Sequence, residues 1–122
     1  MAAEPLIFII DDDASLRAAL VRLVRSFGYR AHGFASAEDF IDADVIRSCS
    51  CVITDIHMPG MSGIELKRVI DGRGCSVPFI MITARAEPEL ERSALASGAL
   101  CFLRKPIDSR ALVQCIESVL GL

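Results

Sequence analysis

The chain has 122 residues, and its 13 basic and 16 acidic side chains give a formal net charge of −3. This length suits one domain that buries a core of its own, and the acidic balance argues against a nucleic-acid-binding domain within these residues. No apolar run approaches the roughly 18 residues of a membrane span, and no basic segment of a signal peptide precedes the first one, so we expect a cytoplasmic protein without membrane contact.

The first apolar run, 6–10, shows no alternation and stops at three aspartates, which is typical of a strand buried on both faces. Apolar residues then recur at helical spacing over 16–27, which predicts the first helix. A weaker strand over 29–34 follows. Ser36 is a suitable N-cap for a short helix that reaches about Ala43.

The third strand is predicted over 51–54, and the turn residues of 58–63 separate it from a helix over 64–72. A buried strand over 79–82 comes next. Proline suits the first turn of a helix and glycine its end, so a helix is predicted over 88–98. Its apolar stripe is thin, and we expect this helix to be loosely held.

The last strand is predicted over 100–103, and Asp108 or Ser109 caps a final helix that runs to Leu120. Five predicted strands therefore alternate strictly with five predicted helices. This order predicts an α/β fold with a parallel sheet covered on both faces by right-handed crossovers. Five strands favour an open, doubly wound sheet over a barrel.

The cysteines contain no Cys-x-x-Cys pair, and the two histidines, His32 and His57, stand in no zinc-binding spacing. We expect free thiols that pack as small apolar side chains, which fits a reducing compartment. The five cysteines are Cys49, Cys51, Cys75, Cys101 and Cys115.

The polar residues that follow the predicted strands carry the chemistry. In open α/β sheets the site lies at the carboxyl ends of the strands, so these residues converge on one edge. Taken singly, each has an ordinary structural role at a helix start, a turn or a solvated surface, and only their convergence supports a site. They are Asp11 and Asp12 after the first strand, Asp55 after the third, Thr83 after the fourth and Lys105 after the fifth.

Carboxylates that are packed together repel one another, so some take up protons or a cation joins them. Carboxylate oxygens suit Mg²⁺, which also prefers phosphate oxygens. A lysine and a threonine beside the cation would bind a phosphoryl group, and a carboxylate can act as the nucleophile that forms an acyl phosphate. The residues alone therefore indicate an aspartate that accepts a phosphoryl group with the help of Mg²⁺.

Four segments of the sequence resemble the signature segments of the receiver domain of bacterial two-component response regulators, most closely those of the FixJ/NarL-type group. Each segment alone is weak evidence, whereas all four in order cover essentially the whole chain. The resemblance implies a CheY-like fold with the strand order 2-1-3-4-5 and one receiver domain over residues 1–122, with the output domain absent from this chain. The segments are 9–13 (Ile-Ile-Asp-Asp-Asp), 54–63 (Thr-Asp-Ile-His-Met-Pro-Gly-Met-Ser-Gly), 82–84 (Ile-Thr-Ala) and 102–106 (Phe-Leu-Arg-Lys-Pro).

The resemblance also implies a role for each residue of the cation site. Asp55 would be the phosphoacceptor and a direct ligand of Mg²⁺ or Mn²⁺, and Asp12 would be the second direct ligand. Asp11 would act through a metal-bound water, and the main-chain carbonyl of His57 would complete the protein ligands.

Thr83 and Lys105 would bind the phosphoryl oxygens, and the peptide bond between Lys105 and Pro106 would be cis. Phe102 stands where the family has its switch aromatic. On phosphorylation Thr83 would move toward the phosphoryl group and Phe102 would turn inward. The surface formed by the helix over 88–98, the last strand and the last helix would then change and could drive dimerisation.

The resemblance implies a sensor histidine kinase as the partner that supplies the phosphoryl group from a phosphohistidine. A transcriptional output would reach DNA only through an output domain outside these residues. The chain itself is expected to be a signalling receiver and not an enzyme, apart from assisting its own phosphorylation and slow autodephosphorylation.

Two further positions give a hypothesis of their own. His57 lies two residues after Asp55, and Arg85 lies two residues after Thr83. Both side chains would overhang the site and affect the access of a hydrolytic water, so we expect them to set the lifetime of the acyl phosphate. The alternative is that His57 contributes only its carbonyl and that Arg85 is a solvated charge.

Three other functions are weighed against the switch. A phosphohydrolase with an aspartyl phosphate lacks support because His57, not a second aspartate, stands two residues after Asp55. A flavodoxin-like carrier needs a phosphate-binding loop after the first strand, where this chain has three aspartates. A receiver that works without phosphorylation is disfavoured by the intact acidic set together with Thr83 and Lys105.

Overall fold

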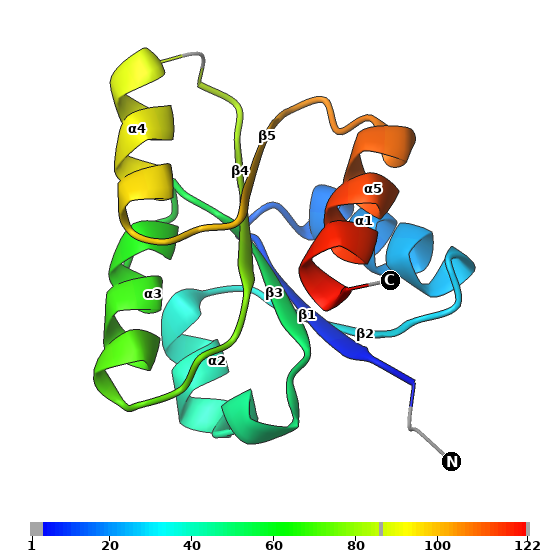
Figure 1. Ribbon diagram of the computed structural model, residues 1–122, viewed down its shortest axis with the longest axis horizontal. Coiled ribbons are helices and arrows are strands. Elements are labelled where there is room, and N and C mark those ends of the chain that lie inside the picture. Colours follow the sequence, from blue (N-terminus) through cyan, green and yellow to red (C-terminus); the bar gives the residue numbers. More distant parts are fainter. Residues whose placement is uncertain (1–3, 86, 122) are drawn as a thin grey trace.

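The structure is a computed structural model that describes residues 4–85 and 87–121 (Figure 1). Strands and helices alternate as the sequence pattern predicts. The strands are β1 (Leu6–Ile10), β2 (Arg30–Phe34), β3 (Cys51–Asp55), β4 (Phe79–Thr83) and β5 (Cys101–Arg104). The helices are α1 (Ala14–Ser26), α2 (Ala37–Ala43), α3 (Gly63–Gly72), α4 (Pro88–Ala96) and α5 (Ser109–Leu120).

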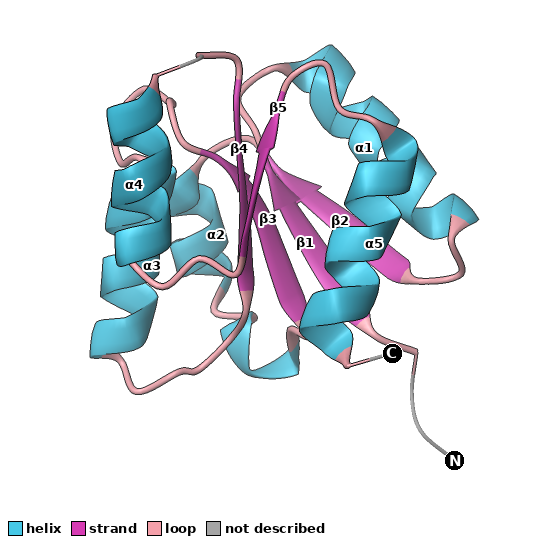
Figure 2. Ribbon diagram, turned by 45° about the horizontal axis from the view of Figure 1, so that its top comes forward, coloured by secondary structure: helices cyan, strands magenta, loops and turns pink. Residues whose placement is uncertain are grey.

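All five strands form one parallel sheet in the order β2-β1-β3-β4-β5. This order confirms the predicted doubly wound fold, with β1 and β3 side by side near the centre. The register pairs Ile10 with Thr54 on these two strands, so the residues that follow each of them lie at the same edge. Figure 2 shows the twist of the sheet and the helices on its two faces.

Successive side chains of a strand point to opposite faces, and the fully buried strands β3 and β4 therefore feed two cores. One core lies under α2, α3 and α4, where Phe8 stacks with Phe34 and Phe40 at centroid distances of 5.4–5.5 Å. The other lies under α1 and α5 and contains Ile9, Ile53 and further branched residues. Each core fixes one layer of helices against the sheet.

Side-chain caps set the starts of four of the helices. Asp13 caps α1, Ser36 caps α2 and Asp108 caps α5, each by accepting a hydrogen bond from a backbone N–H of the first turn. The predicted cap at Ser36 is thus confirmed, and of the two candidates for α5 the structure selects Asp108. Ser62 and Glu65 form a capping box at the start of α3.

Helix α4 is held by less apolar surface than its neighbours, as its thin stripe predicts. Among the described residues of α4, Ala94 is the one that is buried. Leu95, in the same helix, is 47% exposed, and Leu100 in the following loop is 59% exposed. A helix with so few buried contacts is among the segments that move most easily.

Two boundaries differ from the sequence prediction in a way that affects the site. β3 and β4 each extend one residue further and end on Asp55 and Thr83 themselves. The backbone N–H of Ile56 donates to the carbonyl of Ile82 at 3.0 Å, which continues the ladder to the sheet edge. A short 3₁₀ helix over Ile46–Ser48 is also present, and its three residues are too few to show a period in the sequence.

All five cysteines are free thiols, as predicted. Cys51 is fully buried in β3, and the other four are partly exposed, so only Cys51 packs as a core residue in the full sense. Burial raises the pKa of the Cys49 thiol to about 12, which keeps that thiol protonated at neutral pH. In the described part of the chain, no helix has the length and apolar character needed to cross a bilayer.

Candidate functional site

Three aspartates meet at the carboxyl edge of the sheet. Asp11 directly follows β1, Asp12 comes next, and Asp55 ends the neighbouring strand β3. One carboxylate oxygen from each lies within 4.8 Å of the others. The parallel arrangement of β1 and β3 brings the two strand ends together, so the clustering predicted from the sequence is present.

Lys105, which directly follows the edge strand β5, closes this cluster. Its Nζ lies 3.2 Å from Oδ2 of Asp55, where it donates a hydrogen bond, and 3.1 Å from Oδ2 of Asp11. The Lys105 side chain is 18% exposed, whereas Asp11 is completely buried. One ammonium therefore bridges two carboxylates that belong to adjacent strands.

The cluster contains three carboxylates and one ammonium, so its negative charges outnumber its positive charge. Burial raises the pKa of the Asp55 carboxyl above its usual value, Lys105 opposes this shift, and the Asp11 carboxylate adds to it. Burial by itself lowers the pKa of Lys105, but the carboxylates of Asp11 and Asp55 outweigh that effect and hold this pKa above its usual value. The edge carries an excess of negative charge that one lysine does not neutralise.

The loop after β1 is fixed through its backbone. The N–H of Asp13 donates to Oδ1 of Asp11 at 2.9 Å, and Nη1 of Arg17 donates to the main-chain carbonyl of Asp11 at 2.8 Å. The stem of Arg17 crosses β2 at Gly33, where a Cβ would approach Arg17 Cγ to 3.0 Å. Sequence reasoning did not identify Arg17, because helical spacing does not show which loop carbonyl a side chain reaches.

The loop after β3 is equally close to the site. The N–H of His57 donates to Oδ1 of Asp55 at 3.4 Å, so the phosphoacceptor candidate is held by its own loop. Gly63, the first residue of α3, packs on the strand end: a Cβ there would lie 2.5 Å from the main-chain oxygen of Asp55. A side chain at this position would push the helix away from Asp55, which explains why a glycine closes the 54–63 segment.

Thr83 and Arg85 occupy the end of β4. Thr83 is completely buried, and its Oγ1 accepts a hydrogen bond from the N–H of Arg85 at 3.0 Å. Its carbonyl accepts from the N–H of Lys105 at 2.8 Å, which ties the ends of β4 and β5 together. The Arg85 side chain is 60% exposed and lies 4.0 Å from the carboxylate of Glu87.

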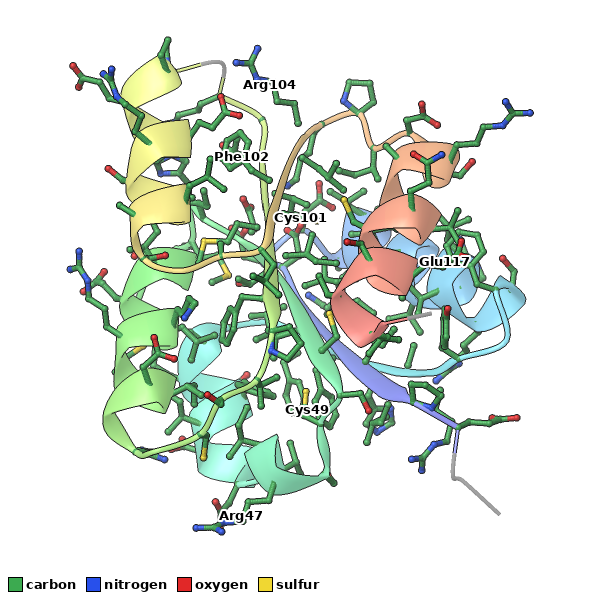
Figure 3. The ribbon with its side chains drawn as sticks, in the orientation of Figure 1. Arg47, Cys49, Cys101, Phe102, Arg104 and Glu117 are labelled. Atoms are coloured by element: carbon green, nitrogen blue, oxygen red, sulfur yellow. The ribbon has the colours of Figure 1, made fainter. Side chains whose placement is uncertain are left out.

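Phe102 and the Lys105–Pro106 bond lie on the strand and loop that carry the lysine. Phe102 is half-buried and packs against the core under α4, and Figure 3 shows its ring on the side of the sheet that faces this helix. The peptide bond between Lys105 and Pro106 is cis, the isomer that the resemblance implies. The ring of His57 is half-buried, and its Nε2 is buried without a hydrogen-bond partner among the described residues.

The donor set fits a small hard cation. Oδ2 of Asp11 is fully buried and accepts no hydrogen bond within the described residues, because its contact with Lys105 is an ion pair without hydrogen-bond geometry. Three carboxylate oxygens within 4.8 Å of one another are the oxygen ligands that Mg²⁺ prefers. A divalent cation between them would offset the excess negative charge of the edge.

An open parallel sheet in this strand order, with an acidic cluster and a bridging lysine at its carboxyl edge, defines the class of signalling domains known as receivers. The family described as the response regulator receiver domain matches residues 7–117. The chain therefore belongs to the receiver domains of two-component response regulators, a family whose general function is a phosphorylation-dependent switch.

Curated relatives align with this chain over part of their own length. The chain is 36% identical to the transcriptional regulatory protein FixJ of Azorhizobium caulinodans over 115 residues, which cover 94% of the chain and 54% of that protein. It is 34% identical over 116 residues to the transcriptional regulatory protein TdiR of Thauera aromatica, covering 95% of the chain and 51% of TdiR. The chain thus spans about half the length of the curated relatives it matches.

Solved structures show the same fold. The structure of FixJ-N superimposes with a TM-score of 0.88 at 26% identity and covers 98% of this chain and 96% of its own. The response regulator StyR gives a TM-score of 0.89 at 36% identity over 98% of this chain and 60% of its own. The predicted fold class and family are therefore confirmed.

The raised pKa of Asp55 predicts an effect on stability. The folded protein holds this proton more tightly than the unfolded chain, so ionisation of Asp55 removes stability as the pH rises from its ordinary pKa of 3.8 through the raised value. Asp55→Asn should therefore have a larger free energy of unfolding than the unchanged protein at neutral pH, and the difference should shrink toward pH 3.8.

The measurement is urea unfolding followed by circular dichroism, with EDTA present to remove divalent cations. Asp42→Asn is the matched control, because Asp42 is an exposed carboxylate on α2 outside the cluster. Equal stability of Asp55→Asn and the unchanged protein at neutral pH would show that the cluster imposes no electrostatic cost.

Proposed function

We propose that this domain is a phosphorylation switch in which Asp55 accepts a phosphoryl group from the phosphohistidine of a sensor histidine kinase. The observation that carries the proposal is the bridging of Asp11 and Asp55 by Lys105 Nζ, at 3.1 and 3.2 Å, beside a third carboxylate. A cation site and an ammonium on either side of one carboxylate are what phosphoryl transfer to that carboxylate requires.

The cation in this proposal is Mg²⁺ or Mn²⁺. Asp12 and Asp55 would bind it directly, Asp11 through a water, and His57 through its main-chain carbonyl. When bound, the cation supplies charge neutralisation for the phosphoryl oxygens. The buried Oδ2 of Asp11 pairs with Lys105 but accepts no hydrogen bond within the described residues, which supports a second cation at this edge.

In the transfer step an oxygen of the Asp55 carboxylate attacks phosphorus, and the bond from phosphorus to the kinase histidine nitrogen breaks. The imidazole leaves with a proton from solvent, and Asp55 becomes an acyl phosphate. Lys105 then pairs with a phosphoryl oxygen and keeps Asp11 as its second partner. The Thr83 hydroxyl donates a hydrogen bond to another phosphoryl oxygen. The hydrogen bond from the Lys105 N–H to the Thr83 carbonyl keeps these two residues adjacent at the sheet edge, which supports this role.

The switch would propagate from Thr83 to Phe102 and the surface of α4, β5 and α5. Thr83 would move toward the phosphoryl group, and Phe102 would turn into the space left beside it. The weak attachment of α4, with Ala94 as its buried residue in the described structure, supports movement on this side. The output of the switch is proposed to be transcriptional, since relatives such as FixJ and TdiR are named transcriptional regulatory proteins.

The whole of residues 1–122 is proposed to form this one receiver domain, and any contact with DNA would be made by an output domain outside them. A cytoplasmic setting is supported by the five free thiols and by the kinase partner. In this role the domain assists its own phosphorylation without turning over an external substrate.

Phosphorylation is tested with acetyl phosphate and Mg²⁺, followed by intact mass. The unchanged protein should gain one phosphoryl group, and Asp55→Asn should gain none because it has no nucleophilic carboxylate at that position. Asp42→Asn, an exposed carboxylate on α2, should gain one group as the unchanged protein does. Turnover of many equivalents of acetyl phosphate without a covalent species would instead identify a phosphohydrolase.

The lifetime of the acyl phosphate tests the hypothesis about His57 and Arg85. Replacing both by Ala should shorten the half-life several-fold if, as we propose, both side chains shield the acyl phosphate from a hydrolytic water. The single variants separate the half-buried His57 from the exposed Arg85. The measurement is phosphate release after removal of the donor, with the exposed Arg92 on α4 changed to Ala as the control. An unchanged half-life in the double variant would refute the hypothesis.

Dimerisation is the last part of the proposal. Leu95 and Leu100 expose 47% and 59% of their surfaces along α4 and the loop before β5, and a second copy could cover them. Sedimentation velocity over a range of concentrations should show association of the phosphorylated protein and not of Asp55→Asn. A monomer at every concentration in both samples would exclude this face as a dimer interface.

A further inference from the structure

The loop between β3 and α3 carries the His57 carbonyl, and few backbone hydrogen bonds define its shape. Of the backbone N–H groups of residues 57–61, two make hydrogen bonds within the described structure. The N–H of His57 donates to Asp55 itself, and the N–H of Met61 donates to Oε2 of Glu38 at 3.0 Å. Glu38 is therefore the partner that holds the loop from outside the acidic cluster.

Glu38 stands on a rigid support. It lies in the first turn of α2. The buried residues of this helix are Ala37, which is fully buried, and Phe40, which is 1% exposed. Phe40 packs edge-on against Phe8 and Phe34 at 5.4 Å, so the helix is anchored to β1 and β2. A carboxylate fixed in this way can define the position of a loop on a different strand connection.

The loop is shaped to receive this carboxylate. Gly60 has a φ of +78°, and a Cβ built on it would overlap Oε2 of Glu38. Glycine is needed here for the left-handed backbone, and the absence of a side chain leaves the space in which the Glu38 carboxylate lies. Two independent features of the loop, an N–H and a missing side chain, face the same carboxylate.

We propose that Glu38 is a positioning residue for the cation and phosphoryl site. By accepting the N–H of Met61, it fixes the far end of the loop whose near end is tied to Asp55, and the His57 carbonyl lies between these two points. The proposal rests on the proposed function. Loss of the Glu38 contact should loosen the His57 carbonyl and weaken Mg²⁺ binding while leaving the fold intact, because Glu38 is exposed.

The test measures two quantities on each variant. Amide hydrogen exchange of Met61, followed by NMR in the metal-free protein, reports the contact itself. Isothermal titration with Mg²⁺ reports the site. Glu38→Ala should expose the Met61 amide to exchange and raise the Mg²⁺ dissociation constant about fivefold, because the loosened loop must be ordered again when the cation binds.

Two further variants separate positioning from charge. Glu38→Gln keeps an acceptor oxygen and should retain most of the Met61 protection and most of the Mg²⁺ affinity. Asp39→Ala removes the same charge from the adjacent exposed residue of α2 and should leave Met61 exchange unchanged and the affinity nearly so. If Glu38→Ala, Glu38→Gln and Asp39→Ala weaken Mg²⁺ binding equally, the effect is charge alone and the proposal is wrong.

The outcome also distinguishes this proposal from the function on which it rests. If the unchanged protein neither binds Mg²⁺ nor accepts a phosphoryl group, the proposed function fails, whatever the exchange of Met61 shows. If the unchanged protein does both and Glu38→Ala does so with unchanged affinity, the function stands and the role of Glu38 is refuted.

Discussion

Much of this domain depends on the ion contacts of one lysine with two carboxylates from neighbouring strands. A parallel sheet brings the ends of β1 and β3 to one edge, so Asp11 and Asp55 lie close together whatever their charge. Lys105 Nζ, at 3.1 and 3.2 Å from the two, offsets part of the repulsion. Since the pKa of Asp55 is still raised, the fold holds these charges at a cost that a cation or a change of partner for Lys105 can relieve.

The two sides of the site differ in stiffness. On the β1 and β3 side, loops are tied by hydrogen bonds to Asp11 and Asp55 and by the anchored helix α2. On the β4 and β5 side, Thr83 is buried, Phe102 is half-buried, and α4 has Ala94 as its buried residue in the described structure. A change in the charge of Asp55 would therefore meet hydrogen-bonded loops on one side and a loosely packed helix on the other. Under the proposed function, this difference in packing would favour movement toward α4.

Local patterns in the sequence predicted the fold and most of the cluster for identifiable reasons. Uninterrupted apolar runs such as 79–82 marked the buried strands, and the parallel sheet then placed Asp11, Asp55 and Lys105 at one edge. The sequence could not predict the contact between Glu38 and Met61, which joins a helix to a loop 23 residues away. Such a contact depends on the relative placement of two elements, which neither helical spacing nor turn composition encodes.

Two charged side chains hold the loops of the site, Arg17 the loop after β1 and Glu38 the loop after β3, and they bind opposite kinds of backbone group. Arg17 donates to the carbonyl of Asp11, whereas Glu38 accepts the N–H of Met61, so each loop is held by the charge that its free backbone group attracts. Arg17 and Glu38 carry opposite charges, and the acidic cluster itself consists of Asp11, Asp12 and Asp55 beside Lys105. The overall charge of −3 therefore says little about the site, whose electrostatics depend on where the sheet places a few residues. Phosphorylation of Asp55 would change the charge of this cluster. The contacts of Arg17 and Glu38 with the loop backbone would keep the positions of the loops during that change.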